Sequence, residues 1–169
     1  MIRDLVASAL DDLGLHYGVH GDTVCLDFRG LPAGYHVCIK EVERPHLLWL
    51  RFTPSIWIDA NASAVLELLT ALNHRTWMVK CVRDITDGEL YFDVEILHYA
   101  EITKETIAEV VMNACGEVTR LLPLVLRVQW GGLSAADALA GGAGEAAPPP
   151  SLAEREALEI VERLETDNE

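Results

Sequence analysis

Two segments of alternating apolar and polar residues meet at Asp87-Gly88 within residues 78–97. Asp-Gly between such segments is typical of a β-hairpin with a two-residue turn, in which both central residues take φ > 0. That turn would pair Val79 with Ile96 and leave one hairpin face apolar except for Arg83. The other face would carry opposite charges across the strands, which stabilises the pairing modestly. The pattern therefore predicts one covered face and one face exposed to water.

The rest of the chain up to residue 130 predicts three helices and three further strands. Helical spacing of apolar residues appears at 2–13, at 62–75 and in a long segment that begins at Thr103, whereas strand patterns appear at 23–28, 35–39 and 47–52. Together with the hairpin, these segments predict an α+β fold. Its antiparallel sheet has about five strands, in α-βββ-α-ββ-α order, and is covered by helices.

The helix ends carry recognisable signals. Asp59 or Asn61 is expected to cap the second helix, and Thr103 the third, because short polar side chains satisfy free backbone N–H groups there. Pro123 is expected to kink or end the third helix, since proline removes one helical hydrogen bond. Ser134 is expected to cap a short helix that follows.

The chain divides by composition into a domain at 1–130, a Gly/Ala/Pro linker at 131–150 and an acidic amphipathic helix at 151–169. A capping-box pattern opens the last helix. Its apolar stripe includes Leu152, Leu158, Val161 and Leu164. A helix this short needs a surface to dock on. Its own domain, a twin subunit and a partner protein all remain open, and we treat these four residues as candidate partner-binding residues.

The net charge of −14 narrows the choice of partners. Binding to phosphate backbones requires clustered Lys and Arg, so we expect no nucleic-acid partner. No apolar segment approaches the roughly 18 residues that a membrane span needs, and the N-terminus lacks a basic leader. We therefore expect a cytoplasmic protein with no membrane contact.

Cysteine and histidine residues show no metal-binding or catalytic spacing. The four cysteines form no CxxC pair and are expected to be free thiols. Cys25 and Cys38 are expected on one face of the predicted strand pair, either across from one another or diagonal, where a cross-strand disulfide is conceivable. His36 is expected to face Asp27 on the surface of the sheet, which is more typical of a surface contact than of acid–base or zinc chemistry. No GxSxG or phosphate-binding loop is present. We predict no catalytic residue, cofactor or metal.

One charged residue stands out on the apolar face of the hairpin. Arg83 either extends its guanidinium to the sheet margin or presents it in the groove between helices and sheet. In that groove it would favour an acidic ligand or a partner, so Arg83 is a further candidate partner-binding residue.

The chain resembles the YbjN-like family, whose fold is similar to that of class I type III secretion chaperones. The resemblance rests on Leu72-Asn73, Asp87-Gly88, the helix start Thr103-Lys104-Glu105 and Pro123, and it extends over residues 2–130. It implies an antiparallel sheet with packed helices, frequent dimerisation and binding of other proteins, with no enzymatic activity. The segment after Trp130 departs from this pattern, and its helix could fill the groove that a client would use.

These inferences favour a non-enzymatic, chaperone-like or regulatory module that binds an unidentified protein and forms a homodimer. A regulatory domain that binds a small molecule in the helix–sheet groove near Arg83 is the alternative. An unrecognised enzyme that uses His36 and Asp27 is a lesser one.

Overall fold

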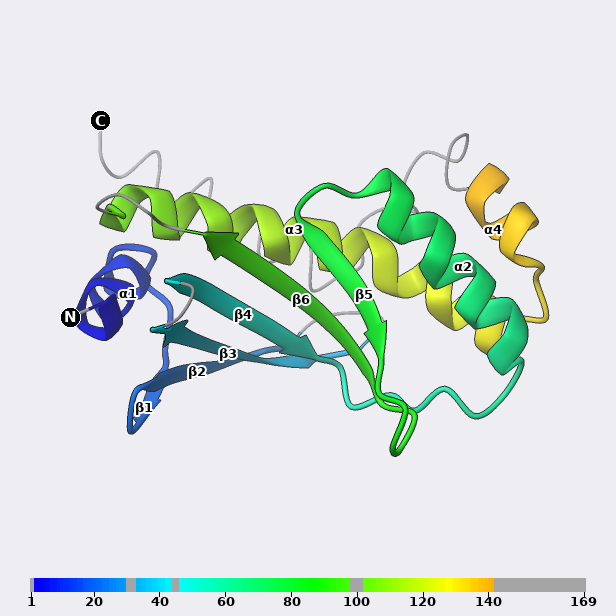
Figure 1. The fold of residues 1–169 in the computed structure, drawn as a ribbon, viewed down its shortest axis with the longest axis horizontal. Helices are drawn as coiled ribbons and strands as arrows, with labels where there is room; N and C mark the ends of the chain where they lie inside the picture. The colour runs from blue at the N-terminus through cyan, green and yellow to red at the C-terminus, as the bar shows by residue number, and fades with distance from the viewer. Residues whose placement is uncertain (1, 30–32, 44–45, 98–101, 142–169) are drawn as a thin grey trace.

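A computed structural model describes residues 2–29, 33–43, 46–97 and 102–141 (Figure 1). Its elements are, in chain order, α1 (Ile2–Asp12), β1 (Gly18–His20), β2 (Thr23–Phe28), β3 (Tyr35–Val42), β4 (Leu47–Thr53), α2 (Ala62–Arg75), β5 (Val79–Arg83), β6 (Leu90–Leu97), α3 (Lys104–Gln129) and α4 (Ala135–Gly141). The α+β class predicted from the sequence is confirmed.

The strands form one antiparallel sheet in the order β1-β2-β3-β4-β6-β5. Sequence reasoning counted five of these strands and missed β1. This strand has three residues, all exposed, so it is too short to show an alternating pattern. The long helix α3 runs along the sheet, with α1 near the start of α3 and α2 and α4 near its end (Figure 1).

The hydrophobic core lies between the helices and one face of the sheet, here called the inner face. One row across this face consists of Leu26, Val37, Phe52, Phe92 and Cys81, from β2, β3, β4, β6 and β5 in turn. None of the five is more than 4% exposed. Buried residues of α1, α2 and α3 belong to the same cluster. Side chains therefore fill the space between helices and sheet.

The β5–β6 hairpin forms with a different register from the predicted one. Val79 pairs with Val94, two residues away from Ile96. A type I′ turn requires φ > 0 at both Asp87 and Gly88, but only Gly88 adopts it, with φ of 83°. The chain instead closes a longer loop, in which the Asp84 N–H donates to the carbonyl of Glu89 over 2.8 Å. A shift of two residues preserves which side chains share a face, so Arg83 still lies on the inner-face side of β5.

Helix α3 continues through Pro123 and ends at Gln129, so the expectation that Pro123 ends the helix is wrong. Proline cannot donate to the carbonyl of Thr119, four residues earlier. Leu121, Leu122 and Val125 on either side of Pro123 are nonetheless buried. Burial of this stripe against the sheet and α2 offsets the missing hydrogen bond. Thr103 caps the start of α3 as predicted, since its side chain accepts from the Thr106 N–H.

The segment before α2 is tied to the end of α3 by two amide side chains. Asn61 precedes α2 but does not cap it, because its side chain donates to the carbonyls of Val128 and Gln129 instead. Gln129 in turn donates to the carbonyl of Trp57 over 2.6 Å and to Asp59 over 3.1 Å. Together, these hydrogen bonds of Asn61 and Gln129 hold the β4–α2 connection in place over the end of the core.

The range 131–150, expected to be a linker, begins with an ordered helix. Ser134 accepts from the Asp137 N–H and caps α4, as the sequence predicts. Ala135 and Ala138 are buried, and α4 contacts α2 and α3. The predicted C-terminal helix at 151–169, with Leu152, Leu158, Val161 and Leu164, lies outside the described residues.

Both edges of the sheet offer little backbone for pairing with an added strand. The outer edge of β5 is bonded by the side chain of Asn73 from α2: its amide donates to the Cys81 carbonyl over 2.9 Å, and its oxygen accepts from the Cys81 N–H over 2.7 Å. Asn73 thereby occupies backbone groups that an added strand would need. The opposite edge is β1, only three residues long.

Candidate functional site: the open face of the sheet

The face of the sheet opposite the helices is covered by no described element, and we call it the open face. Strand alternation places there the side chains that do not enter the core. They include Thr23, Cys25 and Asp27 of β2, His36, Cys38 and Lys40 of β3, Trp49, Arg51 and Thr53 of β4, Tyr91, Asp93 and Glu95 of β6, and Lys80 and Val82 of β5. Most are partly exposed, in contrast to the fully buried inner face.

A cluster of aromatic and charged side chains occupies the middle of the open face. The Lys40 ammonium lies 4.6 Å from the centre of the Trp49 ring. The Arg51 guanidinium lies 4.6 Å from the Trp49 ring and 4.2 Å from the Tyr91 ring. Each contact is within the range of a cation–π interaction. We call Lys40, Trp49, Arg51, Tyr91 and Asp93 the aromatic–cation cluster.

Asp93 holds the central cation of this cluster in place. Arg51 donates two hydrogen bonds to its carboxylate, over 2.8 Å and 2.7 Å. Bonding to Asp93 raises the pKa of Arg51 further above its ordinary value. The two-pronged pair fixes the guanidinium plane, which a lysine could not do. Arg51 is therefore a rigid part of the surface.

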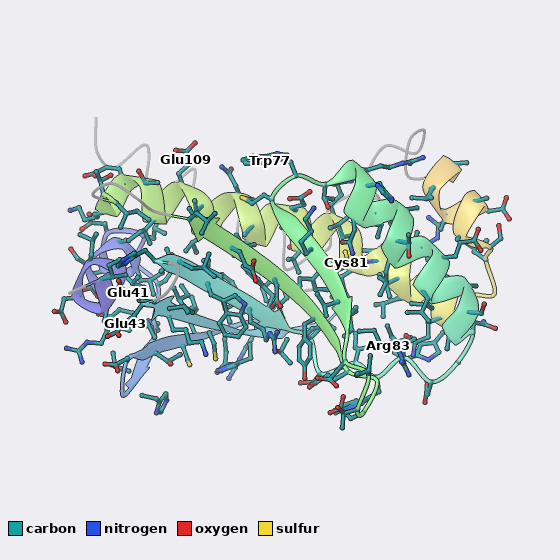
Figure 2. All side chains as sticks on the ribbon, viewed as in Figure 1. Glu41, Glu43, Trp77, Cys81, Arg83 and Glu109 are labelled. Atoms are coloured by element: carbon teal, nitrogen blue, oxygen red, sulfur yellow. The ribbon has the colours of Figure 1, made fainter. Side chains whose placement is uncertain are left out.

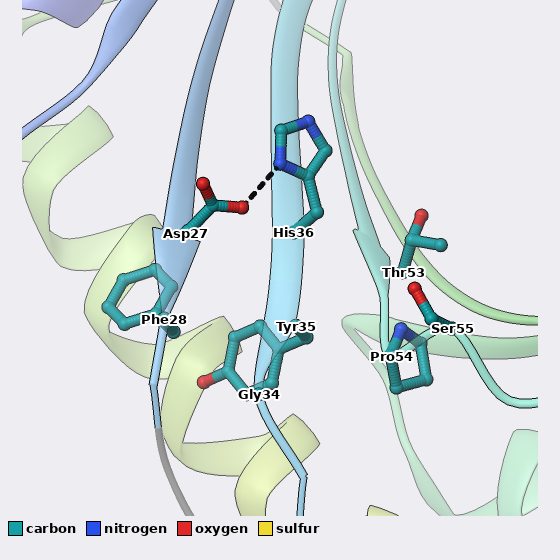
Figure 3. Close-up of a pocket in the computed structure, with 8 residues that line it drawn as sticks. All are labelled: Asp27, Phe28, Gly34, Tyr35, His36, Thr53, Pro54 and Ser55. Carbon is teal, nitrogen blue, oxygen red and sulfur yellow. Dashed lines mark hydrogen bonds and ion pairs between the residues drawn. The ribbon is translucent and has the colours of Figure 1, made fainter.

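A second group of polar side chains lies beside this cluster, on β2 and β3. Cys25 and Cys38 are direct register partners, and their sulfur atoms are 3.1 Å apart as free thiols. Burial is the main cause that raises the pKa of Cys25, to about 12. His36, on the same strand as Cys38, donates a hydrogen bond through Nδ1 to the carboxylate of Asp27 over 2.8 Å (Figure 3). The predicted facing of His36 and Asp27 is thus confirmed.

A shallow depression of about 250 Å³ lies at the Asp27 end of these strands (Figure 3). It is lined by Asp27, Phe28, Gly34, Tyr35, His36, Thr53, Pro54 and Ser55. The side chains of His36 and Asp27 are 45% and 77% exposed. Enzymes usually tune such acid–base groups by removing them from water, and this pair lacks that environment.

Arg83, the sequence-predicted binding residue, lies at the end of β5 beside the hairpin loop (Figure 2). Its guanidinium is close to the backbone of Gly88, where an added Cβ would be 3.2 Å from Nη2. Within the described residues, its buried Nε has no hydrogen-bond partner. Arg83 is not among the residues that line the depression described above.

Comparison with known proteins places this architecture in a family. The family model YbjN, with the description "Putative bacterial sensory transduction regulator", matches residues 3–127. The chain belongs to the YbjN family. Its fold is similar to that in "Crystal structure of YbjN, a putative transcription regulator from E. coli", with a TM-score of 0.57, 20% identity, and coverage of 78% of this chain and 93% of that one. A search of the curated proteins found no match.

The family description is that of a regulator and names no reaction. At 20% identity, the E. coli YbjN structure supports the fold of this YbjN-family chain and nothing about its ligands. Among the helices that the structure describes, none is long and apolar enough to span a membrane.

Sequence reasoning missed both features of the open face in this YbjN-family chain. Trp49 and Tyr91 come together only because β4 pairs with β6, across the intervening α2 and β5. The grouping of Cys25, His36 and Cys38 had a usable signal. His36 and Cys38 are two residues apart, so they share a strand face, and the predicted pairing already placed Cys25 on that face, either opposite Cys38 or diagonal to it.

Proposed function

We propose that this protein is a non-enzymatic regulatory module that binds another protein through the open face of its sheet. The aromatic–cation cluster is the observation that carries this proposal. Trp, Tyr and Arg are the residue types most enriched at binding hot spots. Here one of each is packed on a rigid sheet and left partly exposed to solvent.

Two other parts of the domain, the inner face and the β5 edge, are less accessible to a protein partner than the open face. The inner face is packed against the helices, and its side chains belong to the buried core. Asn73 occupies the backbone edge of β5, so strand addition there would first have to break two hydrogen bonds. The open face is a broad surface that carries the aromatic–cation cluster, and the partner would bind it by side-chain contacts.

Site-specific photo-crosslinking in the native host tests this proposal. A photoreactive amino acid at Val82, on the open face, should crosslink to one defined protein, identified by mass spectrometry. The same group at Trp130, 62% exposed at the end of α3, serves as the control and should not. Adding Trp49→Ala should reduce the Val82 crosslink at least tenfold. Equal crosslinking from both positions, or none from Val82, would contradict the proposal.

We further propose that the protein is a homodimer. An exposed tryptophan outside the open face favours self-association: Trp77, between α2 and β5, is 86% exposed (Figure 2). Tryptophan is among the residue types most enriched at binding hot spots. Light scattering on the full chain should give about twice the chain mass of 18.6 kDa. Trp77→Ser should lower this mass, with Trp130→Ser as the matched control. A single-chain mass for the wild-type protein at high concentration would exclude the homodimer.

A further inference from the structure

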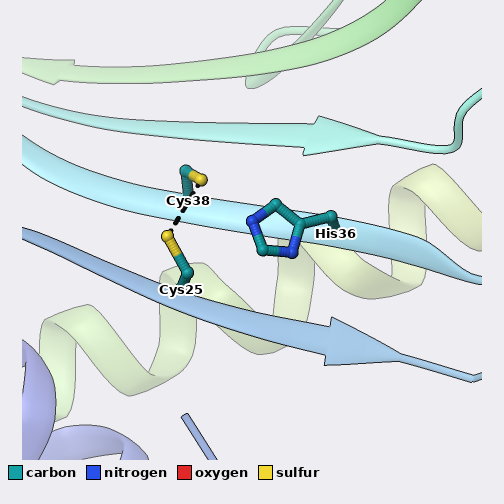
Figure 4. A group of neighbouring side chains, drawn as sticks. All are labelled: Cys25, His36 and Cys38. Carbon is teal, nitrogen blue, oxygen red and sulfur yellow. Dashed lines mark hydrogen bonds between the residues drawn. The ribbon is translucent and has the colours of Figure 1, made fainter. Parts of the chain in front are cut away.

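Three potential metal ligands come together on the open face, beside the aromatic–cation cluster. They are Cys25 of β2 and His36 and Cys38 of β3 (Figure 4). The proposed protein-binding function does not use them. We propose that these three side chains bind a zinc ion.

Strand geometry explains why the three meet. Residues two apart on a strand point to the same face, so His36 and Cys38 share one side of β3. Cys25 is the direct partner of Cys38 in β2, and Asp27 is the direct partner of His36. Regular antiparallel pairing thus sets three ligands at adjacent positions of a rigid hairpin.

The distances suit one small ion. A ring nitrogen of His36 and the two sulfur atoms all lie within 4.8 Å of one another, and the sulfurs are 3.1 Å apart. Zinc binds thiolate at about 2.3 Å, so two sulfurs on a tetrahedral ion are roughly 3.8 Å apart. The observed sulfur–sulfur distance is shorter than that value. Small rotations of the cysteine side chains are enough to reach it.

Asp27 prepares His36 for this role. Its carboxylate lies 2.8 Å from Nδ1, which leaves Nε2 as the free ring nitrogen. Figure 4 shows a ring nitrogen of His36 on the side that faces the two thiols. Histidines that ligate metals typically bond a carboxylate through their other nitrogen, which fixes the ring and its tautomer. Zinc binding therefore explains why Asp27 holds the His36 ring in this orientation. Neither an isolated surface contact nor catalysis explains it.

The donor set indicates which metal the site prefers. Two thiolates and one imidazole suit zinc, whereas calcium and magnesium prefer oxygen ligands. Cys25 and Cys38 are half-buried and His36 is exposed, so an ion can enter from solvent. Three protein ligands leave one position of the tetrahedron for water or for a group from outside the domain.

Cobalt substitution provides the test on the tag-free full chain, reduced, stripped of metal and kept under argon. A free-thiol count of four first confirms that every cysteine is reduced. One Co²⁺ per chain should then give a thiolate-to-cobalt charge-transfer band in the near ultraviolet, which one equivalent of Zn²⁺ removes. Cys25→Ser, Cys38→Ser and His36→Gln should each abolish or strongly weaken the band. Asp27→Asn should lower zinc affinity by about 10–100-fold.

Two controls keep the test decisive. Cys115→Ala removes a thiol of α3, and His74→Gln removes an imidazole of α2, so both variants should retain full binding. Circular dichroism checks that each variant is folded, and His36→Gln gives an answer if a cysteine variant is not. Absence of the charge-transfer band in the reduced wild-type protein would overturn the proposal. So would a band that persists when both Cys25 and Cys38 are replaced. Either result leaves the crosslinking test of protein binding unaffected.

Discussion

Phe92→Ala is expected to lower the free energy of unfolding by about 3–5 kcal/mol, because it leaves a cavity in a core that is packed on every side. Phe92 is 0% exposed and sits in the middle of the inner-face row, between Phe52 of β4 and Cys81 of β5. Urea unfolding followed by circular dichroism measures the change. A loss of this size is a large part of the total stability of a typical domain.

Two further variants complete this experiment: a conservative replacement of Phe92 and an alanine replacement of a less buried phenylalanine. Phe92→Leu keeps most of the volume and should cost less than about 1.5 kcal/mol, so it stays measurable if the alanine variant does not fold. Phe28 is half-buried at the end of β2, so Phe28→Ala should lower the free energy of unfolding clearly less than Phe92→Ala does. If Phe92→Ala cost under about 1 kcal/mol, the described packing of β6 against the helices would be wrong.

Asn73→Ala is expected to destabilise the domain by about 2–4 kcal/mol and to increase self-association. The change removes both hydrogen bonds to the Cys81 backbone and leaves a partly buried donor and acceptor without partners, at about 1–3 kcal/mol each. It also frees the edge of β5 for pairing with another chain. Urea unfolding gives the first effect, and light scattering compared with the wild-type protein gives the second.

Asn113 offers a matched control for Asn73, because it is exposed on α3 and takes part in no described hydrogen bond of its side chain. Asn113→Ala should change stability by less than about 0.5 kcal/mol, as exposed substitutions usually do. Equal effects at the two positions would show that Asn73 acts through helix propensity alone. In that case the proposed protection of the β5 edge would have to be abandoned.

The sequence predicts most of the fold because side-chain alternation depends on local backbone geometry alone. Val24, Leu26 and Phe28 face the helices as their spacing indicates, and the boundaries of α2 are the predicted ones. The register of the hairpin depends on finer detail. Hydrogen bonds around Asp84 select a longer loop over the expected tight turn, and no pattern in the strands reports that choice.

The candidate site was less predictable, because its parts come from distant segments. Arg51 and Asp93 are 42 residues apart and meet only through the β4–β6 pairing. Asn73 belongs to the residues that carry the family resemblance, but its bonds to Cys81 require the packing of α2 beside β5. By contrast, the grouping of Cys25 with Cys38 follows from one local hairpin, which is why the sequence already indicated it.

The packing of α1 against α3 has a consequence for synthesis of the chain. Asp12 of α1 binds Lys104 of α3 over 2.6 Å, although the two are 92 residues apart in sequence. At roughly 5–20 residues per second, a ribosome needs about 5–20 s to add the intervening segment. Leu48, Leu50 and Phe52 are made during that interval and have no helix α3 to cover them until it is synthesised. The nascent chain is thus most prone to aggregation just before α3 emerges, when chaperone contact matters most.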